Sequence, residues 1–259
     1  KGFFLKLATS LMKERKADHP IQPWILNRWS PRSMTGEKIS EEIWQSLFKE
    51  KGMDAKLNER IFLYDVEKNW WSRSGTPDKM PVNEIGGTDS EVFYEFTNIQ
   101  HDEKFGKKCH PNCDCGRFME IGNSVFMQYK KTAKGFEELP NKNVDFGGGV
   151  ERLLAATENQ NDIFQTSLFN SIIQTVELQT KKSYQQHARE MRIIADHFAG
   201  SIFIIANNII PSNKEQGYIL RRLIRRTLDN YYQLDGKDIT PVLEEIIAQY
   251  GKTDDYLID

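Results

Sequence analysis

The stretch from Asn143 to Arg152 reads NVDFGGGVER and predicts a junction between a strand and a helix. Its first residues predict the end of a strand, and three consecutive glycines lead straight into a predicted helix over 150–158. Three further strands are predicted upstream, at Glu91–Phe96, Phe118–Lys130 and Phe136–Leu139. A lysine-rich turn joins the last two as an antiparallel hairpin. Strand pairs followed by a glycine turn and a helix predict a mixed α+β layer.

The same stretch carries groups that bind charged ligands. Glycines permit close backbone approach, and the N-terminus of the helix that follows offers free amide hydrogens to an anion or phosphate. Asp145 is placed to hold an ammonium group, and Arg152 can turn its guanidinium toward a phosphate in the same pocket. The alternative is a strand that ends in a permissive turn with a surface aspartate.

Upstream of these strands the elements are less regular. Apolar spacing predicts an amphipathic helix over 1–20 and a second helix over about 38–51. Ile61–Tyr64 predicts a short strand. Residues 68–90 are rich in glycine, proline, aspartate and asparagine, which favours a loop over a pocket.

Beyond residue 180 the pattern becomes purely helical. Helices are predicted at Tyr184–Asn207, at about 216–232 and at Thr240–Tyr250, with a break at Pro211–Asn213. We therefore expect a domain boundary near residue 180.

The predicted helix over 216–232 has one basic face and one apolar face. At about 100° per residue, four arginines cover one contiguous arc: Arg221, Arg222, Arg225 and Arg226. The other arc carries Ile219, Leu220, Leu223, Ile224, Leu228 and Tyr231. Because unpartnered arginines at i and i+4 repel each other, the pattern favours an anionic partner such as a nucleic-acid backbone. A solvated face whose arginines pair with nearby carboxylates is the alternative.

All three cysteines lie within seven residues, at Cys109, Cys113 and Cys115. With His110 inside the run, or His101 upstream of it, they could supply a tetrahedral zinc shell. Because Cys109 and His110 are adjacent, it is difficult for both to bind one ion. The alternative is a set of free thiols in a hairpin loop.

Composition excludes some classes of protein. Lysine and arginine number 35 against 37 acidic residues in 259, so the net charge of −2 excludes bulk electrostatic coating of nucleic acid. No apolar run approaches the roughly 20 residues of a membrane span, so we expect no membrane role. Few cysteines and no signal-type segment predict a cytoplasmic location. The chain opens at Lys1 without methionine, which is compatible with a piece of a longer protein.

Six segments of the sequence form a longer pattern: Lys68–Trp71, Thr88–Tyr94, Arg117–Tyr129, Asn143–Arg152, Arg192–His197 and Pro211–Arg226. In this order they resemble the alanyl-tRNA synthetases, a family of class II aminoacyl-tRNA synthetases. The resemblance implies a partial class II catalytic domain over 42–180, built on an antiparallel sheet with helices. It implies that an all-helical, truncated domain over 181–259 grips the tRNA acceptor stem.

The activity implied by the resemblance is ATP-dependent activation of alanine and its transfer to tRNA(Ala). The catalytic pair would be Asp145, which holds the alanine ammonium, and Arg152, which contacts the ATP γ-phosphate beside Mg2+. The alanine pocket would be formed by Trp71, Asn123, Val125, Asp145 and Gly147, and ATP would bind at Gly147, Gly149 and Arg152. The acceptor stem would bind at Asn213, Arg221, Arg222 and Arg225. An editing site would lie elsewhere.

The sequence also departs from this family. Class II motifs 1 and 2 are not evident upstream of residue 42, so the activation site is expected to be incomplete unless a second chain supplies them. Residues 1–41 are atypical, and the stretch 19–36 is similar to the N-terminus of nitroreductases, where it holds an FMN phosphate. Three functions stay open: a ligase core, a noncatalytic tRNA-binding or vestigial module and, more distantly, a flavin oxidoreductase.

Overall fold

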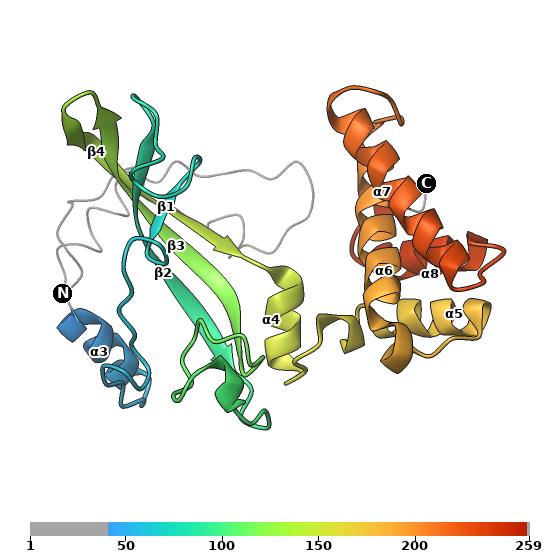
Figure 1. The fold of residues 1–259 in the computed structure, drawn as a ribbon, viewed down its shortest axis with the longest axis horizontal. Helices are drawn as coiled ribbons and strands as arrows, with labels where there is room; N and C mark the ends of the chain where they lie inside the picture. The colour runs from blue at the N-terminus through green and yellow to red at the C-terminus, as the bar shows by residue number, and fades with distance from the viewer. Residues whose placement is uncertain (1–40, 258–259) are drawn as a thin grey trace. The chain divides into compact units, whose positions relative to one another are not determined.

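A computed structural model of the chain describes residues 41–257 (Figure 1). The helix predicted over 1–20 and the nitroreductase-like stretch 19–36 lie outside the described residues. The chain divides into two compact units. One holds the described part of Lys1–Glu91 together with Asn123–Gly147, and the other holds Val92–Gly122 together with Gly148–Asp259.

The strands form one four-stranded antiparallel sheet in the order β1-β2-β3-β4 (Figure 1). They are β1 Trp70–Ser72, β2 Ile85–Glu95, β3 Phe118–Thr132 and β4 Gly135–Gly148. Because the spatial order follows the chain order, each strand is joined directly to its neighbour. The predicted hairpin between the last two strands is confirmed, and so is the α+β class.

Two predictions for the segment before β2 are wrong. The region 68–90 was expected to be a loop, but it contains β1 and the start of β2, and only 68–69 and 73–84 are irregular. The reason is a tertiary contact, because the ring of Trp70 stacks on Tyr129 at 6.0 Å and meets Phe136 edge-on at 5.6 Å. The predicted strand at Ile61–Tyr64 is absent from the described chain, where Ile61 makes a single bridge with Leu57.

Glycine at position 87 permits the close approach of β2 to β3. Trp71 pairs with Gly87 across β1 and β2. A β-carbon on Gly87 would overlap the carbonyl oxygen of Phe126 in β3 and would lie 2.8 Å from its carbonyl carbon. This backbone contact leaves no room for any other residue.

The helices follow the predicted order, with one addition. They are α3 Glu41–Glu50, α4 Val150–Thr157, α5 Asn170–Thr180, α6 Tyr184–Ala206, α7 Glu215–Gln233 and α8 Thr240–Tyr250. Short 3-10 turns lie at η1 Glu103–Phe105, η2 Ile163–Gln165 and η3 Asp255–Leu257. Only α5 was not expected. Among the described residues, no helix is both long enough and apolar enough to cross a membrane.

The helical part has its own hydrophobic core. Buried residues of α5, α6, α7 and α8 pack together, among them Ile172, Val176, Ile194, Tyr231 and Val242. The core also includes Phe169, so it begins upstream of residue 181, where the helical domain was expected to start.

A polar cluster connects the segment before α5 to α6. The Tyr184 hydroxyl donates to Asp162 Oδ2 at 2.7 Å, and Arg192 Nη2 donates to the same oxygen at 2.7 Å. Arg192 Nε donates to the Tyr184 oxygen, also at 2.7 Å. Burial and the neighbouring Asp162 raise the pKa of Tyr184 to about 12, so its hydroxyl stays protonated and able to donate.

Candidate functional site

All the cysteines lie in the loop between β2 and β3, and this loop is closed at its base. The backbone N–H of Phe96 donates to the carbonyl of Arg117 at 2.8 Å, and Arg117 forms an ion pair of 2.6 Å with Glu95. The side chain of Phe96 is fully buried. The two ends of the loop are therefore held together independently of its interior.

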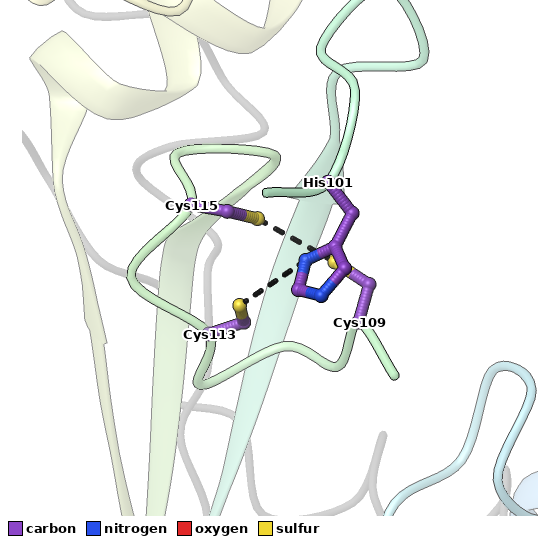
Figure 2. A group of neighbouring side chains, drawn as sticks. All are labelled: His101, Cys109, Cys113 and Cys115. Carbon is purple, nitrogen blue, oxygen red and sulfur yellow. Dashed lines mark hydrogen bonds between the residues drawn. The ribbon is translucent and has the colours of Figure 1, made fainter. Parts of the chain in front are cut away.

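Inside the loop, one histidine and three cysteines converge (Figure 2). The ligand atoms of His101, Cys109, Cys113 and Cys115 all lie within 4.8 Å of one another. Cys109 Sγ lies 3.5 Å from Cys115 Sγ, and Cys113 Sγ lies 3.6 Å from His101 Nδ1. Tetrahedral zinc with ordinary bond lengths requires about 3.8 Å between sulfurs and about 3.5 Å between sulfur and nitrogen. The donor set and its spacing thus fit a closed zinc site.

The histidine that lies with the three thiols is His101, not His110. His110 is adjacent to Cys109 in the chain and is not among the four converging residues. The ring of His101 is oriented by Gly106, whose carbonyl lies 2.7 Å from Nε2. A proton on Nε2 directed at this carbonyl leaves the lone pair of Nδ1 toward the thiols, the arrangement that metal-binding histidines use. Gly106 has φ +126°, which favours glycine.

The pKa values of two thiols in the cluster, Cys109 and Cys115, are shifted in opposite directions. Burial and the neighbouring Cys115 raise the pKa of Cys109 to about 11. Burial also raises the pKa of Cys115, but interactions with His101 and with the backbone of Arg117 outweigh it and lower this pKa to about 6. The same pairing raises the pKa of His101. A divalent cation among the sulfurs would stabilise all three thiolates.

The residues expected to form the alanine pocket lie on three strands of the sheet. Trp71 is on β1, Asn123 and Val125 are on β3, and Asp145 and Gly147 are on β4. Val125 is buried, Asn123 is half-buried and Asp145 is exposed. Trp71 keeps 40% of its surface exposed. No atom lies within 4 Å of a β-carbon built on Gly147, so its backbone is open to a ligand.

Sequence reasoning missed a polar partner of Asn123. Asn123 Nδ2 donates to Asp89 Oδ2 at 3.1 Å, from β3 to β2. The backbone of Asp89 is paired in turn with Asn69, through Asn69 Nδ2 to Asp89 O and Asp89 N to Asn69 O, each at 3.3 Å. Asp89 and Asn69 lie within the segments that resemble the synthetases, but no local pattern marks their pairing.

Arg152, in the first turn of α4, is held by β3. Its Nη1 donates to Glu120 Oε2 at 2.9 Å and to the Glu120 carbonyl at 3.1 Å. A β-carbon on Gly149 would lie 3.3 Å from Arg152 Cδ, so the glycine leaves room for this side chain. Because both of these contacts use Nη1, Nε and Nη2 are the donors that an anion would engage. Glu120 is a second residue that the sequence did not single out.

The predicted basic face of α7 is confirmed for its arginines. Four arginines are exposed: Arg221, Arg222, Arg225 and Arg226. On the opposite side, Leu220, Thr227 and Tyr231 are fully buried. Ile219 was expected on the apolar face, but it is 53% exposed, because it lies at the margin of the buried stripe.

Asn213 is brought to this face by the loop before α7. The backbone N–H of Ser212 donates to the carbonyl of Gly217 at 3.0 Å, which folds the loop over the first turn of α7. A side chain on Gly217 would collide with Ser212, so glycine is required for this packing. In this position Asn213 accepts a hydrogen bond from Arg221.

Comparison with known proteins assigns the chain to a family. A family model described as tRNA synthetases class II (A) matches residues 35–256. The chain belongs to this family of class II tRNA synthetases.

Within the class II synthetases, the similar curated proteins are alanine–tRNA ligases. The enzyme of Petrotoga mobilis is 33% identical over 248 residues, which cover 90% of this chain and 28% of the relative. That of Borrelia hermsii is 36% identical over 233 residues, covering 85% and 36%. That of Elusimicrobium minutum is 38% identical over 181 residues, covering 69% and 20%.

This chain therefore spans about a third or less of these class II relatives. The comparisons do not support a second chain that supplies the missing motifs, because each relative is itself a polypeptide longer than the matched segment.

Proposed function

We propose that the chain is the alanine-activating and acceptor-stem-binding part of an alanine–tRNA ligase. The observation that carries this proposal is that Asp145, on β4, and Asn123 and Val125, on β3, lie on neighbouring strands of one sheet, in a class II synthetase whose relatives are alanine–tRNA ligases. In the activation step, an alanine carboxylate oxygen attacks the α-phosphorus of ATP, and pyrophosphate leaves. In the transfer step, a ribose hydroxyl of tRNA attacks the alanyl carbonyl, and AMP leaves.

Each residue has a defined part in this reaction. Asp145 holds the alanine ammonium, and Trp71 and Val125 limit the size of the side-chain pocket. Arg152, held by Glu120 through Nη1, offers its remaining N–H donors to the ATP γ-phosphate. Mg2+, bound with ATP, would neutralise phosphate charge during transfer.

The exposed arginines of α7 are proposed to hold the acceptor stem of tRNA. Arg221, Arg222 and Arg225 would contact backbone phosphates, and Asn213, already bonded to Arg221, would lie beside them. Such contacts position the RNA with little dependence on its sequence.

The cysteine cluster is proposed to hold one structural zinc ion. His101, Cys109, Cys113 and Cys115 would be its four ligands. With four protein ligands and no open position, the ion would stabilise the loop and take no part in catalysis. Because this loop joins β2 to β3, the ion would also stabilise the connection between the two central strands of the sheet.

The activity test is alanine-dependent exchange of pyrophosphate into ATP. Without the α-phosphate arginine of motif 2, the chain alone is expected to be about 10²–10³-fold slower than the same chain extended by the motif-2 segment of a relative. In the extended protein, Asp145→Asn should abolish exchange, because the ammonium then lacks its counter-charge. Asp54→Asn, at an exposed aspartate of the same unit, is the control.

Two outcomes would contradict this view. Robust exchange by the chain alone would show that the α-phosphate site is already complete. Absence of exchange in the extended protein, together with intact RNA binding, would favour a noncatalytic RNA-binding module.

The RNA surface is tested by the salt dependence of binding. The double variant Arg221→Ala/Arg225→Ala should bind an acceptor-stem minihelix more weakly, and the slope of log K against log salt should fall by about one for each lost phosphate contact. The charge-matched control is Arg60→Ala/Arg73→Ala, which removes two exposed arginines from the other unit. An unchanged affinity and slope in the α7 variant would make its arginines structural.

A further inference from the structure

The hydrogen bond between Asp89 and Asn123 determines which end of the Asn123 amide faces a ligand. Asn123 Nδ2 lies 3.1 Å from Asp89 Oδ2. A carboxylate accepts hydrogen bonds and an amide NH2 group donates them, so this pair forms only with Nδ2 toward Asp89. The carbonyl oxygen Oδ1 of Asn123 is therefore directed away from Asp89 and is able to accept from another group.

Asp89 is itself held firmly. Its backbone exchanges two hydrogen bonds of 3.3 Å with Asn69, and Asn69 Oδ1 accepts from the backbone N–H of Tyr64 at 2.9 Å. Both Asp89 and Asn123 are half-buried. A partly buried side chain with anchored neighbours keeps one orientation at small entropic cost when a ligand arrives.

The register places this pair on the face of the sheet that carries Trp71. Trp71 lies directly opposite Gly87, and Asp89 follows Gly87 by two residues along β2. Opposed residues and residues two apart point to the same face of a sheet. Trp71 and Asp89 therefore share the face on which Asp89 meets Asn123.

We propose that Asp89 is a positioning residue for amino-acid recognition: it holds Asn123 so that Oδ1 accepts a hydrogen bond from the ammonium of the bound amino acid. This inference rests on the proposed function. The ammonium has three N–H donors, and Asp145 supplies its counter-charge while Asn123 supplies a neutral acceptor. Without Asp89, the amide of Asn123 can rotate and present its NH2 group, which repels an ammonium.

The experiment compares two ligands that differ only at this group. They are alanyl-sulfamoyl adenosine, a non-hydrolysable analogue of alanyl-adenylate, and its propionyl counterpart, which lacks the amino group. The ratio of their dissociation constants, measured by calorimetry on the chain, reports the recognition of the ammonium. Asp89→Ala should reduce this preference for the amino-bearing analogue by about tenfold. The dissociation constant of the propionyl analogue should stay within about twofold of the wild-type value. Asp89→Asn, which keeps an oxygen acceptor, should retain the preference.

A double-mutant cycle completes the test. In an Asn123→Ala background, Asp89→Ala should have no further effect on the preference, because the residue through which it acts is gone. Equal weakening of both analogues by Asp89→Ala, or full retention of the preference, would overturn the positioning role. If Asp89→Ala does not fold, Asp89→Ser makes the same comparison. If the wild-type chain binds neither analogue, or binds both equally, the proposed function fails and this inference fails with it. If only the variants lose the preference, the proposed function stands.

Discussion

Removal of zinc is expected to unfold the loop between Phe96 and Arg117. Four donors from one short segment converge there, so a bound cation would cross-link the interior of the loop. Structural zinc contributes about 10–16 kcal/mol of apparent binding free energy in small zinc-binding peptides, so its removal is expected to release the interior of the loop. Protein purified without chelator should contain close to one zinc ion per chain by elemental analysis. After chelation, amide hydrogens of the loop should exchange much faster.

The chain provides a matched pair of histidines to test the ligand set. His101→Ala should lose the metal, because Nδ1 of His101 lies 3.6 Å from Cys113 Sγ. His110→Ala should keep it, because His110 is outside the group of four. Cys113→Ser should also lose zinc, since Cys113 is the most buried of the thiols. A metal-free protein of unchanged stability, or zinc retained by His101→Ala and lost by His110→Ala, would refute the site.

Gly87→Ala is expected to disrupt the sheet. The added methyl group would overlap the carbonyl oxygen of Phe126, and backbone atoms of an interior strand cannot move aside as a flexible side chain can. The free energy of unfolding should fall by about 3 kcal/mol or more, at the severe end of single substitutions. Urea denaturation followed by tryptophan fluorescence measures this, because Trp70 and Trp71 lie on the adjacent strand.

The control is a glycine in a helix with open space around it. A β-carbon on Gly200, in α6, would meet only Leu223 Cδ1, at 3.9 Å. Gly200→Ala should therefore leave stability unchanged or raise it by up to about 1 kcal/mol, through the higher helix propensity of alanine. If Gly87→Ala were as stable as Gly200→Ala, strands β2 and β3 would have to be further apart than the structure places them.

Local signals were sufficient for much of the molecule. The turn of the β3–β4 hairpin, the glycine turn into α4 and the helices α6, α7 and α8 were predicted within a few residues, whereas β4 extends to Gly148, beyond its predicted end at Leu139. Each has an alternating or 3.6-residue apolar period and a turn or break at its end, and these depend only on neighbours in the chain. The clustering of the cysteines was equally visible, because the ligands are close in sequence.

Other features depended on partners distant in sequence. β1 is a strand because Trp70 packs on Tyr129 and Phe136, about 60 residues away by the numbering. Helix α5 has a weakly amphipathic sequence and is held by burial of Ile172 and Ile173 in the helical core. Tertiary packing can override weak local preferences in both cases.

The features of the candidate site also fall into those that the sequence predicts and those that depend on distant partners. Its residue types, from Asp145 to the arginines of α7, were determined by the sequence, because motifs place them at fixed spacing. The tertiary structure alone decided that His101 rather than His110 joins the thiols, that Glu120 holds Arg152 and that Asp89 orients Asn123. Each of these contacts joins residues that come close only when the chain folds. Such contacts depend on distances and directions between side chains, which a residue pattern does not contain.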